Sequence, residues 1–196
     1  MKWTPPDDWS YTYLLGAYLG DGYLSAAGQL LVVCAQEYPE IIEDTRGAMI
    51  LTSLRRHVGV HPHPEHRYVR VACNWQGWFQ AFPQHGRGRK HERPIVLEPW
   101  QQRRVSEYPW QFLKGLLHSD GCRTINRFKT KLPSGRVAEY EYPRWLFSNM
   151  SADIRGLFCA TCEQVGIRWT QSNHRNISVS HRRSVALLDA HVGPKS

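Results

Sequence analysis

The segment Tyr13-Leu14-Leu15-Gly16-Ala17-Tyr18-Leu19-Gly20-Asp21-Gly22 carries the strongest structural signal in the chain, because its pattern occurs a second time. The second copy reads Phe112-Leu113-Lys114-Gly115-Leu116-Leu117-His118-Ser119-Asp120-Gly121. Both segments are apolar at helical spacing and end in Asp-Gly, which is typical of a helix end followed by a turn. We therefore predict two related helices, over residues 9–20 and 108–119, and an internal repeat built around them.

The sequence after each predicted helix supports the repeat. His57-Val58-Gly59-Val60 matches Gln164-Val165-Gly166-Ile167, and a longer hairpin around Pro133-Ser134-Gly135 explains why the spacing differs between the copies. Alternating apolar residues and turn signals predict further elements in the same order in both copies. In the first copy, these are strands at 23–25 and 30–36, a helix at 40–58, a hairpin at 60–74 and a short helix at 76–82. In the second copy, they are strands at 122–129 and 139–148, a helix at 151–165, a hairpin at 167–180 and a short helix at 183–191.

This order predicts an α+β fold made of two pseudo-symmetric αββαββα repeats. We place the N-terminal repeat at residues 1–86, a basic linker at 87–107 and the C-terminal repeat at 108–196. The chain has 196 residues, of which 41% are hydrophobic and 21% charged, as in ordinary globular proteins. No apolar run approaches the roughly 18 residues that a membrane span requires. The N-terminus lacks the apolar core of a signal peptide, so we expect a protein that is not secreted and acts in the cytoplasm, with the nucleoid in a prokaryote, or in an organelle.

The net charge of +8 and the pI of about 9.4 favour a polyanionic partner. Residues 1–98 hold ten basic and ten acidic residues, whereas residues 99–196 hold fifteen and seven, so the excess lies in the second half. Nucleic acid is the first candidate and an anionic membrane the second. A basic protein without such a partner is the alternative.

The five cysteines do not indicate a disulfide framework, because their number is odd and we do not expect the protein to be secreted. Cys159 and Cys162 form a single CxxC within an apparent amphipathic helix. Zinc would require two further ligands at suitable spacing, and no second CxxC or HxxxH is present. We interpret this pair as small core residues and keep a zinc site only as the weaker alternative.

Small residues in the repeated helices predict a close seam between them. Gly16 and Gly20 lie four residues apart, as do Gly115 and Ser119, and this spacing lets two helix backbones approach each other. Such a seam would bring the C-terminal ends of both helices together, and with them the two Asp-Gly pairs.

Asp21 and Asp120 would then lie side by side. Neighbouring carboxylates repel each other, and the C-terminal end of a helix dipole also disfavours an acid. A divalent cation removes both penalties, and hard oxygen ligands beside phosphate suit Mg²⁺, which supports in-line hydrolysis of phosphodiesters. The alternative is that each Asp-Gly only ends a helix and begins a turn.

The two copies resemble the paired motifs of a LAGLIDADG homing endonuclease of the single-chain, two-motif type, over about residues 10–193. The resemblance implies that the motif helices pack at the interface and that two antiparallel four-stranded sheets form a DNA-binding saddle in the major groove. It also implies a monomeric site-specific endonuclease that uses Mg²⁺ to cut both strands across the minor groove and leave four-base 3′ overhangs. Mn²⁺ or Ca²⁺ would replace Mg²⁺ for binding, and the partner would be a pseudo-palindromic duplex of roughly 20 base pairs.

Residue by residue, the resemblance assigns metal binding to Asp21 and Asp120, with the backbone of Gly20 and Ser119. Gln36 and Asn149 each close a core strand, where family members often carry a polar residue that supports the metal-bound water. Arg123 occupies a position that is often basic in the family. We predict that these three residues complete the catalytic shell, and the alternative for Gln36 and Asn149 is a turn residue at a strand end.

Alternate residues of the strands would read the bases or contact phosphates. A solvated strand face, or a solvated join in the case of the linker residues, is the alternative for each of them. The predicted DNA-binding residues are Tyr23, Ser25, Gln29, Tyr68, Arg70, Arg87, Arg89, Lys90, Arg127, Lys129, Lys131, Arg168, Thr170, Ser172 and His174.

Two other functions use the same fold. A transcription regulator would bind DNA without cutting it, and a maturase would bind RNA. Retention of both acids, Asp21 and Asp120, favours the endonuclease over the regulator, and nothing in the sequence excludes RNA.

Overall fold

The computed structural model describes residues 3–193 and 195 and contains the predicted repeat. The N-terminal repeat begins with a long helix that bears the first motif and continues as two hairpins separated by a helix. Its elements are α1 (Asp8–Asp21), β1 (Gly22–Leu24), β2 (Gln29–Ala35), α2 (Pro39–Ser53), β3 (Gly59–Pro62), β4 (Tyr68–Asn74) and α3 (Trp78–Ala81).

The C-terminal repeat has the same order of elements with a much longer first hairpin. Its elements are α5 (Pro109–Asp120), β5 (Gly121–Lys131), β6 (Val137–Ser148), α6 (Ala152–Gln164), β7 (Thr170–Gln171), β8 (Asn176–Val179) and α7 (Arg182–His191). A short 3₁₀ helix, η1 (Lys90–Glu92), and α4 (Pro99–Glu107) lie between the repeats. No helix in the described part of the chain is long and apolar enough to cross a membrane.

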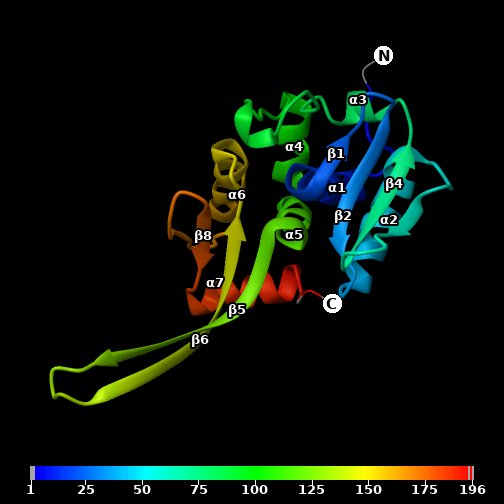
Figure 1. Cartoon of the computed structure of the whole chain (residues 1–196). Coiled ribbons are helices and arrows are strands. Elements are labelled where there is room, and N and C mark those ends of the chain that lie inside the picture. The colour runs from blue at the N-terminus through cyan, green and yellow to red at the C-terminus, as the bar shows by residue number, and fades with distance from the viewer. Residues whose placement is uncertain (1–2, 194, 196) are drawn as a thin grey trace.

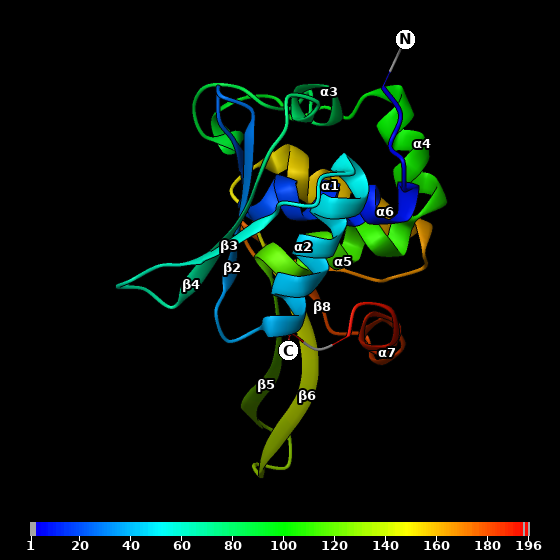
Figure 2. The same ribbon diagram turned by 90° about the vertical axis from the view of Figure 1, so that its right-hand side faces the viewer.

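Each repeat contributes one antiparallel four-stranded sheet, and the two sheets have equivalent strand orders, β1-β2-β4-β3 and β5-β6-β8-β7. The sheets flank the central pair α1 and α5 (Figure 1). Seen from the side, both sheets lie on one side of the molecule and most helices on the other (Figure 2). The structure thus confirms the predicted α+β architecture, with one face of each sheet open and the other packed on helices.

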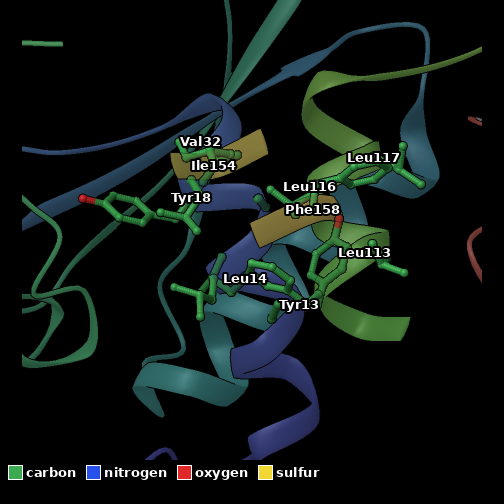
Figure 3. Packing of buried hydrophobic residues seen from close by; sticks show 14 of the residues in the cluster. Tyr13, Leu14, Tyr18, Val32, Leu113, Leu116, Leu117, Ile154 and Phe158 are labelled. Carbon is green, nitrogen blue, oxygen red and sulfur yellow. The ribbon is translucent and has the colours of Figure 1, made fainter. Parts of the chain in front are cut away.

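The core lies between the helices and the inner faces of the sheets (Figure 3). Along β2, Leu30, Val32 and Cys34 are buried, while the alternate side chains are only half-buried. Trp145 and Phe147 of β6 occupy the corresponding inner face of the second sheet. Cys159 and Cys162 are buried on α6, which confirms their interpretation as core residues.

The second helix of the first repeat is shorter than predicted. It ends at Ser53 instead of continuing to residue 58, because Leu54 adopts a left-handed conformation with φ of 55°. Gly166 plays the same part after α6, with φ of 74°. The sequence match between Gly59 and Gly166 is therefore wrong, because Gly59 already belongs to β3, where it pairs with Ala72.

The segment 87–107, predicted as a linker, is partly helical and packed against the core. Gln101 of α4 is fully buried and donates a hydrogen bond of 2.8 Å to the hydroxyl of Tyr11 on α1. Tyr11 in turn donates to the carbonyl of Ala81, and Gln84 donates to the side chain of Gln101. This buried network ties the connecting segment to the N-terminal repeat.

The seam between α1 and α5 permits no side chain at its closest point. A Cβ atom added to Gly16 would lie 2.5 Å from the carbonyl oxygen of Phe112, and one added to Gly115 would lie 2.1 Å from that of Tyr13. Both distances are far below van der Waals contact, and the atoms met belong to backbone that cannot rotate away. The predicted close approach of the two motif helices is therefore confirmed.

We predict that Gly115→Ala destabilises the protein by about 2 kcal/mol or more, because overpacking at the seam outweighs the gain in helix propensity. Gly156→Ala on α6 is the matched control, since a Cβ atom there meets nothing within 4 Å. The control should stabilise by about 0.5–1 kcal/mol. Urea unfolding of the three proteins measures both effects, and a Gly115→Ala variant as stable as the parent would contradict the seam.

Candidate metal and DNA-binding site

The two motif acids meet at the end of the seam. Asp21 is the last residue of α1 and Asp120 the last residue of α5. A Cβ atom added to Gly20 would lie 3.0 Å from Oδ2 of Asp120, so the carboxylate of one helix reaches the last turn of the other. The structure thus brings together the two residues that the repeated motif predicted as partners.

The electrostatics of the pair are unfavourable for two ionised carboxylates. Burial and the neighbouring charge of Asp21 raise the pKa of Asp120 to about 6, although the hydrogen bond from Asn149 opposes the shift. Burial also raises the pKa of Asp21, against the attraction of Lys90 and Lys195. Like charges held close together in this way mark a site that gains from a bound cation.

The structure places Asn149, predicted for the catalytic shell, beside Asp120. Its Nδ2 donates a hydrogen bond of 2.6 Å to Oδ2 of Asp120, and its Oδ1 accepts one of 2.7 Å from the backbone of Ser151. These two bonds orient the amide toward the carboxylate.

Gln36 occupies the equivalent place in the first repeat. The backbone N–H of Gln36 donates to the carbonyl of Arg67, just as that of Asn149 donates to Arg175. The side chain of Gln36 is exposed and forms no hydrogen bond to Asp21 in the described part of the chain. The two halves of the site therefore share their backbone frame and differ in this side chain.

Two lysines complete the site, and the sequence analysis missed their position. Lys90 was predicted to bind phosphates, but its Nζ donates to three backbone carbonyls at the end of α1. These are the carbonyls of Tyr18, of Leu19 at 2.9 Å and of Gly20 at 2.7 Å. Lys195 donates to the carbonyl of Ser119 on α5 at 3.2 Å.

Each lysine follows the closing helix of its repeat, a few residues after Gly86 or Gly193. This shared placement is the signal that could have identified them from the sequence. Burial lowers the pKa of Lys90 to about 8, against the attraction of Asp120 and Asp21. Burial also lowers the pKa of Lys195.

Arg123 does not reach the acid pair, so the geometry does not support its predicted place in the catalytic shell. Its guanidinium forms a bidentate ion pair with Asp189 of α7, with both bonds at 2.8 Å. Arg123 pairs across the ladder with the buried Trp145, which places it on the helix side of β5. Arg123 lies only three residues after Asp120 in the sequence, but successive strand residues point to opposite faces, so this closeness does not bring its side chain to the acid.

The open face of the N-terminal sheet carries most of the predicted DNA-binding residues of the first repeat. Tyr23, Gln29, Tyr68 and Arg70 all pair with residues that alternate with the buried core positions of the sheet. Arg70 donates to the hydroxyl of Tyr68 at 3.0 Å. Ser25 instead lies in the β1–β2 turn, where its hydroxyl accepts from the backbone of Gln29.

The basic residues of the β5–β6 hairpin lie on the opposite face from the one predicted. Arg127, Lys129 and Lys131 share the side of β5 that carries Arg123. Arg127 pairs with Glu141 at 2.8 Å, and Lys129 pairs with Glu139. The predicted alternation along β5 is therefore present, but acidic residues of β6 neutralise part of the positive charge that was expected to contact DNA.

The remaining predicted contacts lie at the surface. Thr170 pairs with Ser178, whose neighbour on β6 is Leu146 of the open face. Of the other predicted residues, one just before β7, two in the β7–β8 turn and two in the linker have exposed side chains. These exposed residues are Arg168, Ser172, His174, Arg87 and Arg89.

The donor set fits a hard divalent cation. Asp21 and Asp120 supply carboxylate oxygens, and Gly20 and Ser119 supply backbone carbonyls that now accept from the two lysines. No group of three or more His, Cys, Asp or Glu side chains suited to a metal occurs in residues 3–193 and 195. An ion at the acid pair would thus complete its shell with water and ligand oxygens, as Mg²⁺ does at phosphate sites.

Comparison with solved structures assigns the fold. The chain is similar to the N-terminal LAGLIDADG domain of WhiA (TM-score 0.55, 13% identity, 96% of this chain and 83% of that one). It is also similar to full-length WhiA from Thermatoga maritima (TM-score 0.62, 14% identity, 95% and 56%) and to the LAGLIDADG meganuclease I-AabMI bound to uncleaved DNA (TM-score 0.57, 10% identity, 94% and 84%).

No protein-family model matches the sequence, and no curated protein matches it significantly. The fold of this chain is established by its structural similarity to LAGLIDADG proteins alone. At this level of identity, function must be argued from the site itself.

We predict that Asp120→Asn stabilises the metal-free protein at pH 7.5 by about 1 kcal/mol. The folded pKa of about 6 exceeds the ordinary value of 3.8, so the folded state binds the proton more tightly and the stability falls as the pH rises from about 3.8 to about 6. The gain should be much smaller at about pH 4.5, where the folded parent carboxyl is protonated and the pH is close to the ordinary pKa of 3.8.

Urea unfolding in the presence of a chelator at both pH values tests this expectation. Asp44→Asn is the control, because Asp44 pairs with Lys114 at 2.8 Å and its loss should not stabilise the protein. A variant at position 120 that is less stable than the parent at pH 7.5 would show that the acids do not repel.

Proposed function

We propose that this protein, which has the LAGLIDADG fold, is a site-specific double-strand DNA endonuclease that depends on a divalent cation. The observation that carries the proposal is the meeting of Asp21 and Asp120 at the end of the glycine seam. A protein that only bound DNA would have no use for two mutually repelling carboxylates at helix C-termini. The solved meganuclease that resembles this chain was crystallised with DNA, which supports duplex DNA as the partner.

The residues divide the work of phosphodiester hydrolysis between them. Asp21 and Asp120 would hold Mg²⁺, which when bound polarises the phosphate and activates water. Asn149 orients the carboxylate of Asp120 through its 2.6 Å hydrogen bond. Lys90 and Lys195 add positive charge beside the acids, where charge develops on a phosphate.

The open faces of the two sheets would hold the duplex. Asp21 and Asp120 end α1 and α5, the helices that lie between the two sheets (Figure 1). The major groove of DNA admits a two-stranded β-ribbon, which suits the projecting β5–β6 hairpin. The net charge of +8 supports attraction to the phosphate backbone. A monomer suffices, because one chain supplies both halves of the site.

We expect plasmid-library cleavage with Mg²⁺ to select members that share one long site and to leave 3′ overhangs. Asp21→Asn and Asp120→Asn should each slow cutting by more than about 100-fold, since even outer partners of a metal contribute 10–100-fold. Both variants should still bind the selected duplex, and a chelator should stop the parent.

Asp44→Asn removes an acid of the same charge from the helix side and should cut like the parent. A parent that binds duplex DNA tightly but never cuts it in Mg²⁺ or Mn²⁺ would replace the endonuclease with a DNA-binding regulator.

A further inference from the structure

A basic hollow that the cutting reaction does not use lies at one end of the N-terminal sheet. It has a volume of about 820 Å³ and is lined by Arg46 of α2, by the loop between α2 and β3, and by residues of β2, β3 and β4. We call it the N-terminal cleft. The described residues that line it include no acid, and its basic side chains are Arg46, Arg55, Arg56, His57 and His61.

The register of the sheet places this cleft away from the acid pair. Gly22, which follows Asp21, pairs with Val32, whereas the cleft is lined by Gln29 and its partner Asn74 at the far end of β2. Three residues of extended chain separate the two rows, roughly 10 Å. A duplex that lies on the open face and continues past the β1–β2 turn would pass the cleft.

The arginines of the loop are available for a ligand. Arg55, Arg56 and His57 are exposed, and neither Arg55 nor Arg56 forms a side-chain ion pair with any described residue. Arg46 has a single acidic contact, with Glu43 at 3.3 Å. Several guanidinium groups without carboxylate partners repel one another, and a polyanion removes that repulsion.

The C-terminal repeat shows that this charge is not a general property of the fold. The rows formed by Gly59 with Ala72 and by Thr170 with Ser178 are equivalent in the two sheets, and the second row borders a hollow of about 610 Å³. Arg168 and His181 line that hollow together with an acid, Glu163. The basic lining is therefore specific to the N-terminal cleft, although residues 1–98 carry no net charge.

The first hairpins of the two repeats differ in length, and the shorter one belongs to the repeat that has the basic cleft. β1 has three residues, whereas β5 has eleven and projects with β6 far from the body (Figure 1). A duplex would thus meet a long ribbon on the C-terminal side and only a short turn on the N-terminal side. The N-terminal cleft stands where that shorter hairpin stops.

We propose that the N-terminal cleft binds backbone phosphates of duplex DNA beyond the end of the N-terminal sheet. The contacts would be independent of base sequence, because guanidinium groups recognise phosphate oxygens by charge and bidentate hydrogen bonds. The cleft would hold the flank on the side where the protein lacks a ribbon. This inference rests on the DNA-binding part of the proposed function, but not on cleavage.

The test measures binding of the full chain to a fluorescent random-sequence duplex of about 40 base pairs as salt is raised from about 50 to 200 mM. The variant is the double substitution Arg55→Gln with Arg56→Gln. Arg103→Gln with Lys114→Gln is the control, because it removes the same charge from the helix side, where α4 and α5 lie away from the open face (Figure 2).

Loss of two phosphate contacts should lower the slope of log K against log salt by about 2 and weaken binding at the upper salt concentration roughly tenfold. The control pair should change neither quantity to this extent. Equal effects of both pairs, or no effect of the Arg55 and Arg56 substitutions, would overturn the inference while DNA binding by the parent stands. A parent that does not bind the duplex would overturn the proposed function and this inference with it.

Discussion

The backbone contact between α1 and α5 at Gly16 and Gly115 is the constraint on which the rest of the structure depends. Because no side chain separates the helices there, they pack along their length and end at the same level. This common end brings Asp21 and Asp120 together, and each strand that follows leaves the seam toward its own sheet. The position of the acids and the open face of the two sheets thus share one physical cause.

Close packing at the seam also creates an electrostatic problem. Two carboxylates lie at helix ends that already carry partial negative charge. Burial, together with the charge of Asp21, raises the pKa of Asp120 to about 6. Lys90 and Lys195 offset part of this charge by donating to the terminal carbonyls of the two helices. The remaining repulsion lowers stability where a cation and a phosphate would act, as is common when function requires a strained or charged site.

The two repeats share a frame but have diverged in the parts that would meet a duplex. Asn149 contacts its acid, whereas Gln36 stands at the same backbone position without such a contact. The long β5–β6 ribbon belongs to one repeat and the arginine-lined cleft to the other. Pseudo-symmetry of the backbone therefore does not imply that the two repeats make equivalent contacts with the two halves of a target duplex.

The sequence by itself determined the repeat, the motif helices, the order of helices and strands along the chain, and the identity of the acid pair. Each of these follows from the spacing of residues that are close together in the sequence. Helical and strand periodicity, Asp-Gly helix ends and small residues four apart need no knowledge of distant contacts. The tertiary structure alone decided where Lys90 and Lys195 lie, which face Arg127 and Lys129 occupy, and that arginines of one loop line a cleft. Those facts depend on which segments meet in space. A shift of one residue in strand register moves a side chain to the other face of the sheet, and the path of a connecting segment decides which residues it contacts, while the local sequence pattern stays the same.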